Sequence, residues 1–383
     1  MTTTINNKNK KANVPNLRFP EFQGEWITYK IKDVLSIGNG RDYKHLNNGG
    51  IPVFGTGGYM TSVDECLYDG ETTFIGRKGS INKPFYYNGK FWTVDTLFYT
   101  HSFNGITPKF TYCLFQTINW LKYNEASGVP SLSKDTIEKI KINIPKLEEQ
   151  NKIAKLMFAL DERIATQNKI IDKLQSLIKG LNDTLYAQHG DEVMTSFAEL
   201  GTSYSGLSGK SAQDFGSGKP FITYLNVYSN NVINENEFQY VAIKDGEKQN
   251  IVEYGDVLFT LSSETPNEVG IGSVFLGKEK VYLNSFCFGI HITNKEVAFP
   301  PFLSYYVSST AFRKFIYPFA QGSTRFNLCK ADFEKASVES PTVENEKRIY
   351  SILSHIDSKI ETEKHMLDLY NSQKQYLLRQ MFI

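Results

Sequence analysis

Two motifs in this sequence could belong to a catalytic site, and neither has the residues that catalysis requires. The glycine-rich stretch VFGTGG at 53–58 lacks the GxGxxG of a dinucleotide site and the FxGxG of a methyltransferase, which favours a tight turn between strands. The stretch AFPPFLSYY at 298–306 contains the PPF of an amino-methyltransferase loop. However, Phe299 stands where an Asn or Asp would hold the target amino group, and a phenyl ring cannot accept that hydrogen bond. Catalysis by this chain alone is therefore not expected.

Other catalytic and metal-binding signatures are missing from the sequence as well. There is no GxxxxGK[ST], HExxH or GxSxG, and the six histidines form no cluster along the chain. The four cysteines include no CxxC and no histidine at ligand spacing, so we expect reduced thiols and neither a metal site nor a cofactor in this chain: Cys66, Cys113, Cys287 and Cys329.

Basic and amide side chains gather in two loops near the N-terminus, GNGRDYKHLNNGG at 38–50 and IGRKGSINK at 75–83. Such side chains suit phosphates and base edges. A solvated loop without function explains the first stretch equally well, whereas function is favoured for the second. Together with the turn at 53–58, they give these candidate DNA contacts: Arg41, Lys44, Asn47, Thr56, Arg77, Lys78 and Lys83.

The second half of the chain has four polar stretches of similar character: SYSGLSGKSAQ (203–213), TYLN (223–226), LSSETPN (261–267) and QGSTRFN (321–327). They supply further candidate DNA contacts: Ser205, Lys210, Tyr224, Asn226, Ser262, Ser263, Thr324 and Arg325. Acidic side chains outnumber basic ones between 194 and 326, and the whole chain has a net charge of only +1. Binding to a polyanion therefore needs a focused patch or charge from a partner.

A duplication organises the elements that carry these loops. IPKLEEQNKIAKLMFALDERI at 144–164 returns as SPTVENEKRIYSILSHIDSKI at 340–360. At an offset of 196 residues, 132–187 aligns with 328–383 without a gap, and 13 of the 56 positions are identical. An ungapped match of this length indicates an internal duplication.

Both copies contain a heptad pattern. Apolar residues recur at alternating steps of four and three from Ile153 to Leu185 and from Ile349 to Met381. Gln167 and Glu363 interrupt the two seams at equivalent positions, and Lys374 interrupts the second alone. The pattern predicts two helices of about 40 residues, roughly 60 Å long, that pair as a coiled coil. In an antiparallel pair Gln167 and Glu363 would lie near each other and set the register, and Lys374 would be exposed or extend toward solvent.

The stretches before the helices are rich in short β-type runs broken by Gly and Asn, and they resemble each other only faintly. We expect an α+β protein with two β-rich globular domains, each followed by a long helix. The expected parts are a polar, disordered tail (1–19), a first β-rich domain (20–130), a first region with a long helix (131–190), a second β-rich domain (191–327), and a second region with a long helix (328–383).

Several motifs together resemble the specificity subunit of type I restriction-modification systems: VPNLRFPEFQGEWITYKIKDV at 14–34, IPVFGTGG, GETTFIGRKGS and LSKDTIEKIKINIPKLEEQNKIAKLM. The resemblance implies that each β-rich domain is a target recognition domain for one half of a split double-stranded DNA sequence. It implies that the two helices form an antiparallel coiled coil that fixes the gap, with a pseudo-two-fold axis relating the two halves of the chain. It also implies two modification subunits that bring S-adenosylmethionine and methylate adenine, and two restriction subunits that bring ATP, Mg and DNA cleavage.

Other functions remain open at this point. A non-catalytic adaptor could use the long helices to bind protein partners. A self-sufficient restriction-modification enzyme, or the recognition part of a type IIG-like system, is a further alternative, although the missing cofactor motifs weigh against an enzyme. No stretch is apolar enough for a membrane span or a secretory signal, so we expect a cytoplasmic protein without membrane contact.

Overall fold

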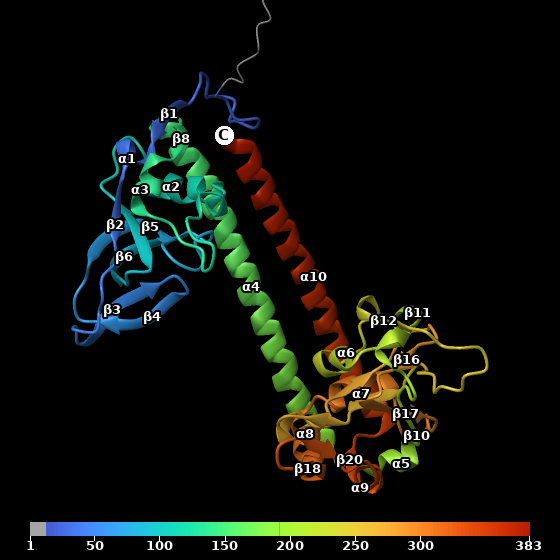
Figure 1. Cartoon of the computed structure of the whole chain (residues 1–383). Helices are drawn as coiled ribbons and strands as arrows, with labels where there is room; N and C mark the ends of the chain where they lie inside the picture. The colour runs from blue at the N-terminus through green and yellow to red at the C-terminus, as the bar shows by residue number, and fades with distance from the viewer. Residues whose placement is uncertain (1–12, 191) are drawn as a thin grey trace, which may run out of the picture. The chain divides into compact units, whose positions relative to one another are not determined.

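The structure is a computed structural model that describes residues 13–190 and 192–383. The chain divides into two compact units: unit 1 comprises residues 1–168 and 365–383, and unit 2 comprises residues 169–364. Two long helices, α4 (Leu147–His189) and α10 (Val343–Met381), each contribute one half to unit 1 and the other half to unit 2. In Figure 1, α4 is green and α10 is red.

Unit 1 is built on a six-stranded sheet with the order β2-β7-β5-β6-β3-β4. The strands are β2 (Ser36–Asn39), β3 (Asn48–Gly55), β4 (Gly58–Val63), β5 (Tyr68–Gly76), β6 (Phe85–Thr93) and β7 (Leu97–His101). All neighbouring strands are antiparallel except β3 and β6. The aromatic rings of Phe74 and Phe91, which are fully buried, lie 4.7 Å apart on one face of the sheet. This sheet positions the loops at 38–50 and 75–83.

The remaining elements of unit 1 surround a second core. They are β1 (Ile27–Lys30), which pairs with β8 (Lys141–Ile144), and the helices α1 (Ile31–Val34), α2 (Pro108–Phe115), η1 (Trp120–Tyr123) and α3 (Lys134–Lys139). Thr107 caps α2 by accepting a hydrogen bond from the Phe110 backbone N–H, as expected at a helix N-terminus. Trp26, Phe110 and Met157 share this core with Phe382 from the end of the chain.

Unit 2 has several smaller sheets. A four-stranded sheet follows the order β10 (Gly201–Ser205), β17 (Cys287–Ile292), β13 (Val257–Thr260) and β15 (Gly272–Val274). One three-stranded sheet follows the order β12 (Gln239–Val241), β11 (Phe215–Ile222) and β16 (Tyr282–Leu283). Another follows the order β14 (Ser262–Ser263), β19 (Phe326–Leu328) and β18 (Ala320–Gly322), and β20 (Val338–Ser340) pairs with β9 (Val193–Thr195).

Short helices complete unit 2 around a core rich in phenylalanine. They are α5 (Phe197–Leu200), η2 (Ala212–Asp214), α6 (Tyr224–Ser229), η3 (Glu235–Glu237), η4 (Pro266–Glu268), α7 (Pro300–Tyr306), α8 (Thr310–Ile316), η5 (Tyr317–Phe319) and α9 (Lys330–Lys335). The rings of Phe197, Phe259 and Phe333 pack with centroid distances of 5.0 to 5.5 Å. The PPF sequence at 300–302 therefore begins a buried helix, α7, in this core.

The two units repeat the same backbone pairing in the segment that precedes each long helix. In unit 1 the Leu132 backbone N–H donates to the Arg77 carbonyl at 2.9 Å, and in unit 2 the Leu328 N–H donates to the Leu261 carbonyl at 2.8 Å. Lys78 forms a bridge with Ser131, and Ser262 pairs in the same way with Asn327. The duplication therefore extends into β-rich stretches whose sequences resemble each other only faintly.

The heptad seams are the inward faces of the long helices. In unit 1 the buried residues Ile153 and Met157 of α4 share a core with Leu378 and Met381 of α10. In unit 2, Ile178 and Leu181 of α4 share a core with Ile349 and Leu353 of α10. The later part of each helix meets the earlier part of the other, so the packing is antiparallel in both units. The predicted fold class, with β-rich domains followed by long helices that pack together, is confirmed.

Two details near the chain ends differ from the expectations. Lys374 is half-buried, and its Nζ lies 2.5 Å from Asp161 Oδ1 of α4, because an interhelical carboxylate accommodates the charge within the seam. Residues 1–12 of the expected disordered tail lie outside the described residues. Residues 13–19 are anchored instead: the Leu17 N–H donates to the Gln380 carbonyl, and Arg18 pairs with the buried Glu149.

Candidate nucleic-acid interface

Five of the predicted contacts in unit 2 come together around one cavity of about 750 Å³. They come from three separate sequence stretches: α6, the segment around β14, and the hairpin between β18 and β19. We call this cavity the Arg325 groove; its lining residues are Tyr224, Leu225, Tyr228, Ser262, Ser263, Glu264, Glu268, Phe286, Thr324 and Arg325. The structure thus assembles polar side chains that lie up to about a hundred positions apart in the sequence.

Hydrogen bonds and ring contacts fix the shape of the Arg325 groove. Arg325 Nη2 donates to Ser262 Oγ at 3.2 Å, and the Tyr224 hydroxyl donates to the Ser262 carbonyl at 2.9 Å. The Arg325 guanidinium carbon lies 5.9 Å from the centre of the Phe286 ring, within cation–π range. Tyr224 and Tyr228 stack with an interplanar angle of 17°. The groove therefore combines flat aromatic walls with an ordered cation.

Two carboxylates also line the Arg325 groove. Glu268 accepts hydrogen bonds from the Tyr228 hydroxyl at 2.8 Å and from Ser263 Oγ at 3.0 Å. These bonds, the Tyr228 bond first among them, lower the pKa of Glu268, so it is ionised at neutral pH. Glu264 is exposed. Because these charges oppose a phosphate, the groove fits the edge of a base better than the DNA backbone.

The other three predicted contacts of unit 2 lie elsewhere. Lys210 is nearly buried, and its Nζ donates to Glu247 and to the Ala242 carbonyl, each at 2.6 Å. The hydrogen bond from Lys210 is the largest cause that lowers the pKa of Glu247 to about 2. Asn226 of α6 is completely buried; its side chain donates to the Asn234 carbonyl and accepts from the Asn234 N–H. Both side chains are thus engaged in stabilising the fold, which removes them from the candidate interface. Ser205 is exposed at the end of β10.

In unit 1 the predicted cations Arg77 and Lys78 are exposed directly after β5 and line a cavity of about 540 Å³. Arg77 Nη1 donates to the Asp95 carbonyl at 3.3 Å, and its guanidinium lies 6.0 Å from the centre of the Phe98 ring. An arginine over an aromatic ring thus occurs in both units, although on different strands. Thr56 lies at the β3–β4 turn, close to Gly79, where an added Cβ would lie 3.9 Å from Thr56 Oγ1.

Three of the remaining predicted residues of unit 1 lie between β2 and β3, and the fourth, Lys83, lies just before β6. Arg41 is exposed, and its backbone is fixed by bonds with Trp92 and Thr93. Lys44 and Lys83 are exposed. The side chain of Asn47 donates to Asp64 at 2.9 Å, and this bond lowers the pKa of Asp64. The structure therefore brings Arg77, Lys78 and Thr56 close to one turn, while Asn47 has a role in holding its loop.

Sequence reasoning missed Phe286. Its ring is 56% exposed at the edge of the Arg325 groove. It precedes β17 in the stretch KVYLNSFCFGIHI, where aromatic residues are typical of a buried strand. The sequence offers no signal that separates Phe286 from its buried neighbour Phe288, since both lie in the same apolar run.

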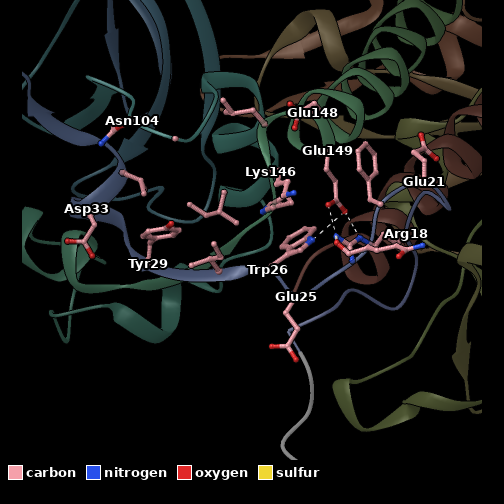
Figure 2. Close-up of a pocket in the computed structure, with 18 residues that line it drawn as sticks. Arg18, Glu21, Glu25, Trp26, Tyr29, Asp33, Asn104, Lys146, Glu148 and Glu149 are labelled. Atoms are coloured by element: carbon pink, nitrogen blue, oxygen red, sulfur yellow. Dashed lines mark hydrogen bonds and ion pairs between the residues drawn. The ribbon is translucent and has the colours of Figure 1, made fainter.

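A third cavity, of about 730 Å³, lies at the start of α4 in unit 1 (Figure 2). At its edge Glu149 is buried between Arg18, whose Nη2 lies 2.7 Å from Glu149 Oε2, and Trp26, whose Nε1 lies 3.3 Å from Glu149 Oε1. Most charged residues around this cavity are acidic: Glu21, Glu25, Asp33, Glu148 and Glu149. This cavity is therefore unsuited to DNA phosphates.

Within the described residues, no group of three or more His, Cys, Asp or Glu side chains is arranged to hold a metal ion. The same part of the chain contains no helix that is long and apolar enough to span a membrane.

Comparisons with known proteins identify the family. The profile of the type I restriction modification DNA specificity domain matches residues 23–176 and 205–369. The putative type I restriction enzyme MjaX specificity subunit of Methanocaldococcus jannaschii is 24% identical over 92% of this chain and 84% of its own length. The MjaVIII specificity subunit of the same organism is 29% identical, over 40% of this chain and only 36% of its own length.

A solved S subunit of a type I restriction-modification system from M. genitalium has the same fold, with a TM-score of 0.61 and 15% identity over 97% of this chain and 99% of that one. The expected resemblance is confirmed. Because the family profile covers most of the chain in two segments, this protein belongs to the type I restriction-modification specificity family, whose members are non-catalytic subunits for DNA target recognition.

Proposed function

We propose that this specificity subunit recognises a bipartite sequence in double-stranded DNA, with one half read by each β-rich domain. The observation that carries this proposal is the Arg325 groove, together with the turn at Arg77 and Lys78 in unit 1. Both present a cation beside an aromatic ring, although the cation comes from a different strand in each of the two duplicated units. The backbone arrangement repeats while the exposed side chains differ, as expected if two domains read two different sequences.

The recognition domains are proposed to be 20–130 and 191–327, and the long helices are proposed to set the gap between the two half-sites. Exposed candidates in unit 1 for contacts to bases or phosphates are Arg41, Lys44, Arg77, Lys78 and Lys83. Gln167 is almost buried, and Glu363 is half-buried and forms an ion pair with Lys359. We retain both as candidates for fixing the register of the helices.

The catalytic work is assigned to partner subunits. Two modification subunits would bring S-adenosylmethionine and methylate adenine, and two restriction subunits would bring ATP and Mg for translocation and cleavage. With a net charge of +1, the chain itself offers little unspecific attraction for DNA. Partners that enclose the duplex would supply further phosphate contacts beyond those of the exposed cations of this chain.

The test is to co-express the chain with its methyltransferase partner and to map methylated adenines across the genome by single-molecule sequencing. One split motif with a constant gap is the expected result. Exchange of residues 22–130 for those of a relative should then change one half of the motif and leave the other half and the gap unchanged. An assembled, folded complex that methylates no defined motif would contradict the proposal and favour a protein-binding adaptor.

A further inference from the structure

We propose that Arg325 recognises a guanine in the half-site read by unit 2, with Phe286 and Ser262 holding its side chain in position. This inference rests on the proposed DNA recognition and assigns one base to one residue. Arginine is the side chain that most often reads guanine, because its planar group of donors matches the O6 and N7 acceptors in the major groove.

The backbone of Arg325 is held in a short hairpin. Gly322 and Phe326 pair across β18 and β19, and Arg325 lies in the turn between them. Gly322 has a φ of 143°, and a Cβ at this position would lie 2.1 Å from the Arg325 carbonyl oxygen. Only glycine therefore fits, and the tight turn restricts where the Arg325 side chain begins. The next strand, β19, is fixed in turn by the pairing of Asn327 with Ser262.

The side chain of Arg325 is held at its far end as well. The hydrogen bond to Ser262 uses one donor, and the Phe286 ring supports the guanidinium. Within residues 13–190 and 192–383, no carboxylate forms an ion pair with Arg325. Arg325 is exposed, so most of its donors remain available for a ligand while its orientation is largely set. Such preorganisation suits base recognition better than a mobile contact to phosphate.

The surroundings of Arg325 also favour a base over a phosphate. Glu264 and the ionised Glu268 line the same groove and would repel a phosphate group. A carboxylate can accept a hydrogen bond from the amino group of cytosine, the partner of guanine. The exposed ring of Phe286 and the half-buried ring of Tyr224 offer apolar surface for a base edge or a thymine methyl group.

Comparison of the two units shows that the fold does not require an arginine at this place. At the offset of 196 residues, Arg325 corresponds to Val129, which is 68% exposed. In unit 1 the cations Arg77 and Lys78 instead occupy the places of Leu261 and Ser262, although the backbone bonds around them are the same. The position of the cation therefore differs between the two domains, as expected for a residue that determines which sequence each domain reads.

The experiment uses the complex of the full chain with its methyltransferase partner and a DNA library randomised at each position of the mapped motif. Wild type is compared with Arg325→Ala, Arg325→Gln and the control Lys248→Ala, which removes an exposed cation of unit 2 outside the groove. The half-site that stays constant when residues 22–130 are exchanged belongs to unit 2. The readouts are the base preference at each position and the salt dependence of binding.

For Arg325→Ala we expect the preference for one G·C pair in the unit 2 half-site to fall by roughly 10- to 100-fold, while the other half-site is unchanged. Arg325→Gln should shift the preference at that position toward adenine, because glutamine pairs with its N6 and N7. Lys248→Ala should leave both half-sites unchanged. If a variant complex keeps the wild-type base preferences in the unit 1 half-site, that complex is folded and assembled.

Three results would overturn the inference while leaving the proposed function in place. The first is a unit 2 half-site without a G·C pair. The second is an unaltered base preference in both Arg325 variants. The third is an equal loss of affinity for all sequences, together with a decrease of about one in the slope of log affinity against log salt concentration. This result would identify a phosphate contact. Absence of any motif in the wild-type complex would instead contradict the proposed function itself.

Discussion

Gln150 and Glu346 occupy equivalent positions in the two units and hold the same point of the backbone. Gln150 Oε1 accepts a hydrogen bond from the Thr107 N–H at 2.8 Å, just before α2. Glu346 Oε2 accepts one from the Phe299 N–H at 2.5 Å, just before α7. Both side chains are buried, so unit 2 has a carboxyl group where unit 1 has a neutral amide. Burial raises the pKa of Glu346 to about 8.

This raised pKa predicts that stability falls as pH rises. In the unfolded chain Glu346 titrates near pH 4.3, so between about pH 4.3 and 8 the folded state binds a proton that the unfolded state has lost. Raising the pH through this window therefore favours unfolding. Glu346→Gln should remove this contribution, so the melting temperature should fall less between pH 6 and 8.5 in the variant than in wild type.

The matched control for this experiment is Glu344→Gln, because Glu344 is largely exposed in the same first turn of α10. It should keep the pH dependence of wild type in thermal unfolding. Equal slopes for wild type and Glu346→Gln would show that Glu346 is already ionised in the folded protein.

The ion pair between Lys374 and Asp161 should stabilise the helix packing in unit 1. Its side chains are only 13% and 26% exposed, so solvent screens the pair less than it screens a surface pair. A double-mutant cycle with Asp161→Asn and Lys374→Met, followed by denaturant unfolding, should give a coupling energy of about 1 kcal/mol.

The exposed pair Asp135–Lys139 in α3 provides the comparison, since its side chains are 74% and 66% exposed. Its double-mutant cycle should give a clearly smaller coupling energy, and high salt should reduce that energy more than it reduces the coupling of the buried pair. Additive effects of the Asp161 and Lys374 substitutions would mean that the two residues do not stabilise each other.

Arg18→Ala should destabilise unit 1, because it leaves the Glu149 carboxylate buried without its cation. Glu149 is 2% exposed, and Arg18 makes two hydrogen bonds to it. We expect a loss of about 2 kcal/mol in the free energy of unfolding, less than for a pair that is sealed from water, because Arg18 keeps some exposure. The combined variant Arg18→Met with Glu149→Gln should regain part of this loss.

Lys152→Ala is the control for that variant. Lys152 pairs with Glu21 in the same region, but both side chains are nearly half exposed, so its removal should change stability little. If both substitutions have the same effect, the burial of Glu149 does not matter for the stability of unit 1.

Phe382→Ala should destabilise the core of unit 1 although the residue is last but one in the sequence. Its ring stacks on Phe110 with centroids 5.4 Å apart and lies 6.2 Å from the Trp26 ring. Removing a buried phenyl group costs about 3 kcal/mol or more. Hydrogen exchange should become faster in 106–120, around α2, whereas Ile383→Ala, at a residue 47% exposed, should have no such effect. Unchanged exchange in Phe382→Ala would show that the end of the chain does not support this core.

The long helices and the duplication could be predicted from the sequence because their signals are local. The heptad from Ile153 to Leu185 follows from the helical period alone, and the structure buries or half-buries its positions. Several parts of the Arg325 groove could also be predicted, since Gly, Ser and Thr runs around Arg325 indicate loops.

The remaining features of the candidate site depend on contacts between distant residues. Lys210 is indistinguishable in sequence from an exposed loop lysine until the fold brings Glu247 to it. The exposure of Phe286 depends on the distant segments that form the Arg325 groove, and the anchoring of Arg18 depends on Glu149, more than a hundred residues later. No periodic pattern encodes such pairings, so the structure was needed to separate candidates for binding from residues that maintain the fold.

The position of Phe382 in the core of unit 1 has a consequence for the order in which the protein folds during synthesis. Residues 13–168 leave the ribosome first, but their core lacks Leu378, Met381 and Phe382 until α10 has been translated. Unit 2 occupies one continuous stretch, 169–364, so its core residues are all translated before the last core residues of unit 1. The domain that is made first is therefore completed last, and a premature stop within the final turns of α10 would impair the N-terminal domain.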